Sequence, residues 1–148
     1  MNPEKNSLNR NRDLTGLILR LTIGIIIFPH GAQKVFGWFG GYGFSGTMQL
    51  FTTTFGLPWL IALLVIIIEF FGPIALIFGF ITRVAGLAIA GVMLGIVITS
   101  HLQNGFFMNW YGTIKGEGFE YFIPVIAIAL SLVLSGGGRW SVDGMLSK

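Results

Sequence analysis

The chain has 148 residues, of which 53% are hydrophobic and only 10% are charged, and its formal net charge is +3. Because soluble domains carry about 25% charged residues, this composition indicates a single-domain integral membrane protein. The chain has no cysteine, which excludes disulfides, thiol redox chemistry, iron–sulfur clusters and cysteine-ligated zinc. Its basic residues are not clustered on one soluble face, so we expect no nucleic-acid partner.

The chain begins with a polar and charged segment, residues 1–13, which we expect to be a short cytoplasmic leader. The first apolar run, about residues 14–35, predicts a membrane helix. Arg20 interrupts this run and no small-residue cleavage site follows it, so we expect an uncleaved helix rather than a signal peptide. At the helical period, Arg20 and Lys34 fall on one face and His30 lies at its edge.

A second apolar run, residues 57–80, contains one acidic residue, Glu69, near its middle. At about 1.5 Å per residue this run spans the roughly 30 Å hydrocarbon core of a bilayer. A carboxylate at that depth is expected to face protein or a water-filled cavity and to have a partner. Counting along ideal helices places Glu69 about 12 Å in depth from His30 and about 10 Å from Arg20. Since the Arg20 side chain is long, we expect Arg20 to be the partner of Glu69, directly or through water.

Two further apolar runs predict helices at about residues 83–101 and 119–135. The short turn before Arg83 predicts an antiparallel hairpin with the second helix. Gly91 and Gly95 have the spacing at which membrane helices approach closely. We therefore expect an all-α integral membrane protein: a four-transmembrane-helix antiparallel bundle over residues 14–140, followed by a cytoplasmic tail at 141–148.

Four helices place both termini on one side of the membrane, and the distribution of basic residues indicates which side. Seven lie on or near the side of the termini and two on the other, namely Lys5, Arg10, Arg12, Arg20, Arg83, Arg139 and Lys148 against Lys34 and Lys115. This excess predicts cytoplasmic termini. The glycine- and aromatic-rich connections, about 36–56 and 102–118, then face outward. In the first of them, the spacing of Met48, Phe51 and Phe55 predicts one side of a short interfacial helix.

The candidate site residues are the ionisable groups within the helices and the aromatic groups of the outward connections. We expect Glu69 and Arg20 to handle protons, with His30 as a further catalytic candidate, and a bound quinone to contact a set comprising His30, Lys34, His101, Trp38 and Trp110. Each has a structural alternative: a buried structural acid, snorkelling cations, histidines that only pack, and aromatic belts at the interface. A bis-histidine haem requires both histidine rings in one cavity and is disfavoured. No nucleophile–base set, phosphate loop or metal-ligand spacing is present.

The sequence also resembles a known family. The run LILRLTIGIIIFPHGAQKVFGWFGG resembles the opening of the DoxX family, and further likeness lies in Glu69 with Gly72, GFITR at 79–83, GFEY at 118–121 and GRWSVD at 138–143. The resemblance covers nearly the whole chain and implies a multi-pass, four-helix protein of the bacterial inner membrane. Relatives include subunits of thiosulfate:quinone oxidoreductase. The family-like positions are Arg20, His30, Gly31, Lys34, Glu69, Arg83 and Glu120.

Together, the polar residues and the resemblance lead to the hypothesis that the chain is a membrane subunit of a quinone-linked redox system. If the subunit is catalytic, it acts as an oxidoreductase with quinone and with a partner that supplies electrons. Any sulfur transfer would occur on that partner, because this chain lacks cysteine. A small anion such as thiosulfate could instead bind Lys34 with His30. Two alternatives remain open: a non-catalytic scaffold that packs against a larger protein, and a transporter of protons or a small solute that works as a homo-oligomer.

Overall fold

The computed structural model describes the backbone of residues 3–147 and the side chains of residues 11–147. Residues 1, 2 and 148, at the ends of the expected leader and tail, lie outside the described residues, as do the side chains of Lys5 and Arg10. All regular structure in the described part is helical. The four longest helices are α1 (Pro3–Phe36), α3 (Trp59–Phe78), α4 (Thr82–Ile96) and α5 (Phe122–Ser135).

The predicted helices agree with these bounds to within a few residues, with one exception. Helix α1 begins at Pro3, so most of the segment expected to be a leader is part of the first helix. Helix α4 continues through a π-helical turn, Val97–His101, which carries it to the end predicted from the sequence. The first aromatic connection is also largely helical, with α2 (Gly43–Gln49) followed by a π-helical turn, Leu50–Thr54.

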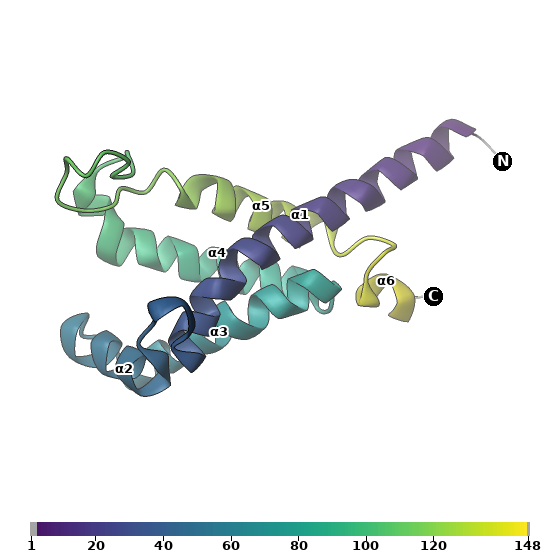
Figure 1. The fold of residues 1–148 in the computed structure, drawn as a ribbon. Helices are drawn as coiled ribbons and strands as arrows, with labels where there is room; N and C mark the ends of the chain where they lie inside the picture. Colours follow the sequence, from purple (N-terminus) through teal and green to yellow (C-terminus); the bar gives the residue numbers. More distant parts are fainter. Residues whose placement is uncertain (1–2, 148) are drawn as a thin grey trace.

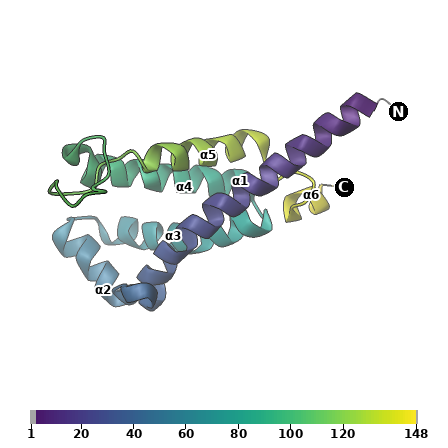
Figure 2. The same ribbon diagram turned by 45° about the horizontal axis from the view of Figure 1, so that its top comes forward.

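The arrangement of the helices determines where polar groups meet. Helices α3, α4 and α5 run side by side, and α1 crosses α3 obliquely (Figures 1 and 2). The strongest packing is between α1 and α3 and between α4 and α5. A common apolar core joins the four helices and includes Ile23, Ile27, Leu76, Ile89 and Leu132. Both described ends of the chain lie at the same end of this assembly (Figure 1).

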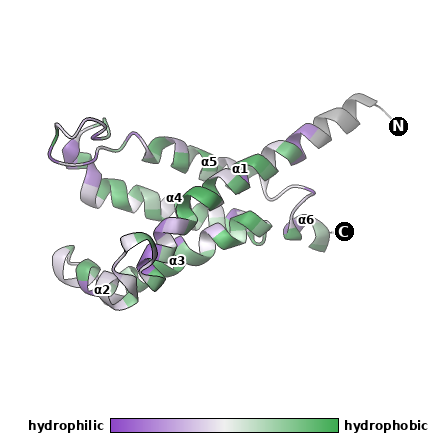
Figure 3. Ribbon diagram, viewed as in Figure 1, coloured by the Kyte–Doolittle hydropathy of each residue, from purple (hydrophilic) through white to green (hydrophobic). Residues whose placement is uncertain are grey.

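Within the described residues, three segments are long and apolar enough to cross a membrane: Asn11–Phe36, Trp59–Phe78 and Thr82–Asn104. Helix α5 is also apolar but has only 14 residues. Apolar residues cover the outer sides of the helices as well as their inner sides (Figure 3), and large side chains such as Phe78, Val84 and Leu87 are exposed. An apolar surface of this extent matches contact with lipid rather than with water.

The short helix α6 (Val142–Leu146) ties the C-terminal segment to the α3–α4 turn. The carboxylate of Asp143 accepts hydrogen bonds from the backbone N–H groups of Ile81, at 2.7 Å, and Thr82, at 2.8 Å, at the start of α4. Burial alone would raise the pKa of Asp143, but the hydrogen bonds from Thr82 and Ile81, together with the charge of Arg20, hold this pKa below its ordinary value. Two of the sequence motifs, GFITR at 79–83 and GRWSVD at 138–143, therefore contact each other at the α3–α4 turn.

Candidate functional site

Glu69 is paired with Lys34, not with Arg20 as the sequence had led us to expect. Its Oε2 atom lies 3.0 Å from Lys34 Nζ, and the Glu69 side chain is 3% exposed while that of Lys34 is 19% exposed. Lys34 Nζ also donates a hydrogen bond to the backbone carbonyl of His30, at 3.3 Å. The pair joins the last turn of α1 to the middle of α3.

The oblique crossing of α1 over α3 explains why the expected partner was wrong. Gly31 lies directly against α3, so closely that a Cβ at this position would collide with the carbonyl oxygen of Glu69 and the Cα of Phe70. This contact brings the end of α1 to the level of Glu69, and Lys34 follows one turn later. Depth counted along upright helices therefore overestimated the separation of the two levels.

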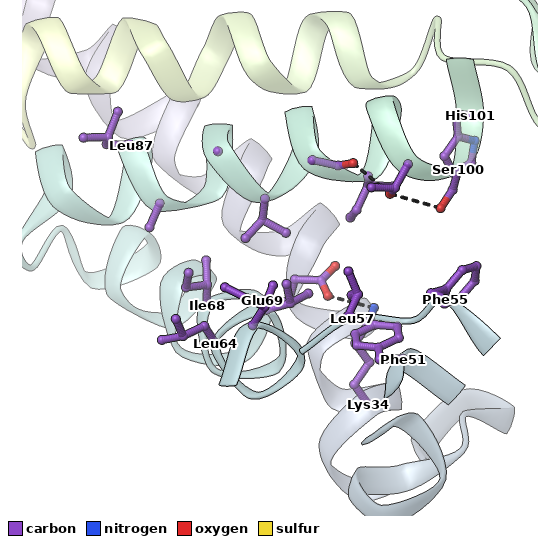
Figure 4. A pocket seen from close by; sticks show the side chains of 18 residues that line it. Lys34, Phe51, Phe55, Leu57, Leu64, Ile68, Glu69, Leu87, Ser100 and His101 are labelled. Atoms are coloured by element: carbon purple, nitrogen blue, oxygen red, sulfur yellow. Dashed lines mark hydrogen bonds and ion pairs between the residues drawn. The ribbon is translucent and has the colours of Figure 1, made fainter. Parts of the chain in front are cut away.

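The ion pair lines a cavity of about 590 Å³ between α3 and α4 (Figure 4). Glu69 and Lys34 lie on one side of it and His101 on the other, at the end of the π-helical turn that follows α4 (Figure 4). The remaining lining is mostly apolar and includes Leu57, Leu64, Ile68, Leu87 and Ile96. The cavity thus combines a large apolar volume with a few ionisable groups, which is typical of small-molecule sites.

Gly91 and Gly95 line this cavity, and no helix packs against them. The sequence predicted a close helix contact at this pair, but no atom lies within 4 Å of where a Cβ of either glycine would be. The small-residue side of α4 therefore widens the cavity. The same side continues to Thr99, whose hydroxyl donates to the carbonyl of Gly95 at 2.8 Å.

His101 has one ring nitrogen fixed by the connection that follows α4. Its Nδ1 lies 2.8 Å from the backbone carbonyl oxygen of Glu117, and the amide of Asn104 donates to the same oxygen at 3.0 Å. Since a carbonyl only accepts, Nδ1 is the donor in this hydrogen bond, and in the tautomer that carries only this proton Nε2 is an acceptor. The ring also packs on Phe122, with centroids 4.6 Å apart.

Arg20 lies at the opposite end of the assembly, near the described chain ends. It is fully buried and donates hydrogen bonds to the backbone carbonyls of Leu76, at 3.3 Å, Ile77, at 3.3 Å, and Trp140, at 2.7 Å. Gly79 has a positive φ of 67°, and a side chain there would collide with the guanidinium. In this structure Arg20 ties α1 to the end of α3 and to the C-terminal segment.

The other candidate residues lie outside the cavity. His30 is exposed and is not among the lining residues, so it does not share the cavity with His101. Trp38 is 52% exposed and its ring lies 5.0 Å from that of Phe36. Trp110 is 75% exposed, and its indole N–H donates to Glu120 at 2.6 Å. Neither tryptophan lines the cavity.

Sequence reasoning did not assign Phe51, Phe55 or Ser100 to the site, although all three line it. The signal for the first two was present, because they share one side of the expected interfacial helix. Their position over the cavity depends on how the α2 segment folds back against α3, which helical periodicity does not report.

Comparison with known proteins identifies the family of the chain. The DoxX family model matches residues 15–102, more than half of the chain. "Putative oxidoreductase CatD" of Bacillus subtilis (strain 168) is 32% identical over 125 residues, which are 84% of this chain and 83% of that protein. "Inner membrane protein YqjF" of Escherichia coli (strain K12) is 29% identical over 141 residues, 95% of this chain and 98% of that protein. No solved structure gives a significant match. The chain therefore belongs to the DoxX family of membrane proteins.

Proposed function

We propose that this protein is a membrane subunit of a quinone-linked oxidoreductase system, and that the cavity between α3 and α4 receives the quinone ring. The observation that supports this most is the Glu69–Lys34 pair in the wall of a large, mostly apolar cavity. Burying an ion pair carries a desolvation cost, so its presence beside an open volume favours a functional role. A quinone combines the two properties of the cavity, a polar ring and an apolar tail.

The polar side of the cavity suits the ring. The Lys34 ammonium has three donors, and two of them are directed to Glu69 and to the His30 carbonyl. The third remains available to a ligand oxygen. Because Glu69 compensates the charge of Lys34, the cavity offers little net attraction to a small anion, which favours a neutral ligand over thiosulfate.

The apolar side of the cavity suits a tail. A second hollow, of about 390 Å³, is lined by α3, the α3–α4 turn and α4, and it shares Ile68 and Ala88 with the first. Its other lining residues include Phe71, Phe78 and Val84, which are exposed on the outer side of the helices. An isoprenoid tail could enter laterally from the bilayer along this path.

The proposal includes a topology. Four membrane-spanning helices in the bacterial inner membrane, with cytoplasmic termini, would place the His101 end of the cavity on the outward side. The Escherichia coli relative is named an "Inner membrane protein" and the Bacillus subtilis relative a "Putative oxidoreductase". A protein partner would supply the electrons.

The test is to quantify the quinone that co-purifies with the protein in mild detergent. Gly91→Leu fills open space in the cavity and is expected to lower the quinone content severalfold. Ala127→Leu, on the exposed side of α5, is the matched control and should leave the content unchanged. Wild-type protein without enrichment over bulk lipid, or equal contents in both variants, would contradict the proposal.

A second candidate function, a scaffold that packs against a larger protein, is supported by the connection between α4 and α5. Phe107, Trp110 and Tyr111 are all largely exposed there, and aromatic residues are enriched at protein interfaces. Native mass spectrometry and cross-linking in membranes would identify a partner. An isolated monomer that also retains quinone would exclude the scaffold and favour the cavity function.

A further inference from the structure

We infer that the cavity selects the reduced, dihydroxy form of the quinone ring over the oxidised form. The inference rests on the proposed function, and it specifies which chemical state of the ligand the site takes. It is based on the hydrogen-bonding groups that line the cavity, among which acceptors outnumber the donors that are free to bind a ligand.

On the α3 side, the acceptor is the Glu69 carboxylate. Its Oε2 atom is buried 3.0 Å from Lys34 Nζ, with which it forms the ion pair, and no described residue donates a hydrogen bond to its other oxygen, Oε1. A carboxylate has about four lone-pair sites and no donor. Glu69 therefore has acceptor capacity left, at the edge of an open volume (Figure 4).

On the α4 side, the acceptor is His101. Because Nδ1 donates to the Glu117 carbonyl, the neutral ring presents Nε2 as an acceptor, and no described residue donates to that atom. His101 and Glu69 both line the cavity from different helices.

The two hydroxyl groups on the α4 side do not reverse this balance. Thr99 Oγ1 donates its proton to the Gly95 carbonyl, at 2.8 Å. The contact between Thr99 Oγ1 and Ser100 Oγ, at 3.3 Å, then requires Ser100 to be the donor. Both protons are thus used within the wall, and neither hydroxyl has a proton left for a ligand. Of the ion pair in the cavity wall, only Lys34 has an N–H left to donate to a ligand.

A quinone and a hydroquinone differ in what they offer such a wall. The two carbonyl oxygens of a quinone only accept, so they can use Lys34 but supply no proton to the free oxygen of Glu69 or to His101 Nε2. A hydroquinone offers two O–H donors to these acceptors, and its oxygens can still accept from Lys34. Since hydrogen bonds to charged acceptors are stronger than neutral ones and unmade buried bonds are costly, we expect a preference of about tenfold or more for the reduced ring.

The test is anaerobic calorimetric titration of the purified full-length protein with tetramethyl-1,4-benzoquinone and with its hydroquinone. The hydroquinone should bind about tenfold more tightly. Glu69→Gln and His101→Phe should each reduce this ratio, and His101→Phe retains an aromatic ring against Phe122. A hydroquinone with one hydroxyl methylated should lose most of the advantage.

The outcomes separate the inference from the function on which it rests. Binding in the cavity is the binding that Gly91→Leu abolishes. If neither the quinone nor the hydroquinone binds in this way, the proposed quinone function is wrong. If both bind in the cavity but the quinone binds as tightly as the hydroquinone, the function stands and the inference is wrong. A preference that survives both Glu69→Gln and His101→Phe would also overturn the inference.

Discussion

At the scale of single residues, the account depends on the pairing of Glu69 with Lys34. A buried carboxylate and a mostly buried ammonium, 3.0 Å apart, compensate each other's loss of hydration. The sequence identified both residues as site candidates, because ionisable groups within an apolar helix are rare and costly. It did not identify them as partners, because the register between two helices is set by their packing.

Removing one partner should be far more harmful than removing both. Lys34→Met leaves the Glu69 carboxylate buried without a counter-charge and should destabilise the protein by about 3–5 kcal/mol. The double variant Lys34→Met with Glu69→Leu should recover most of this loss. Unfolding of the purified protein in detergent provides the measurement, with Lys115→Met, at an exposed position, as the control. A loss for Lys34→Met no larger than for the control would show that the pair is not formed.

At the scale of elements, the contact of Gly31 with α3 sets the register of the site. No side chain fits there, because the Glu69 carbonyl and the Phe70 Cα occupy the space. Gly31→Ala should therefore lower the stability by about 1–3 kcal/mol or more. Gly91→Ala, where the space is open, should be neutral or slightly stabilising because alanine is the better helix former. Thermal unfolding of the two variants compares them directly, and equal effects would contradict the observed helix crossing.

The α3–α4 turn gives a prediction for acid pH. The pKa of Asp143 is held below its ordinary value of 3.8, so its stabilising contribution is complete above that value and is lost as the pH falls through the lower, folded-state pKa. Asp143→Ala should cost about 1 kcal/mol at neutral pH, as for other helix caps. The difference from the wild type should narrow when unfolding is measured at progressively lower pH, below about 4. A difference that is constant with pH would argue against an ionised cap.

How far the sequence predicted the elements follows from what each pattern reports. The apolar runs located α3, α4 and α5 to within a few residues, because length and hydropathy are properties of one segment. The partner of Glu69 and the role of Gly91 were predicted wrongly, because both depend on two segments at once. The helical periodicity of a single segment does not report how α1 crosses α3, nor that one side of α4 is left open.

At the scale of the whole molecule, the proposed topology can be tested by cysteine labelling, because the chain has no cysteine of its own. Thr113, in the connection between α4 and α5, and Ser147, next to α6, are both exposed. These two segments lie at opposite ends of the helices (Figure 1). Thr113→Cys should react with a membrane-impermeant maleimide in cells whose outer membrane is permeabilised and whose inner membrane is intact. Ser147→Cys should react only after the inner membrane is permeabilised. Labelling of both cysteines from the same side would contradict a four-span topology.

The central claim is that the cavity between α3 and α4 holds a quinone-type ring beside the Glu69–Lys34 pair. The most direct measurement is photolabelling of native membranes with an azido-quinone, followed by mass spectrometry of the labelled peptides. We predict label within residues 64–69 and 87–101, which include much of the cavity lining, and its loss when excess unlabelled quinone competes or when Gly91→Leu fills the space. Label confined to the outer sides of the helices, or label that excess quinone does not displace, would contradict the account.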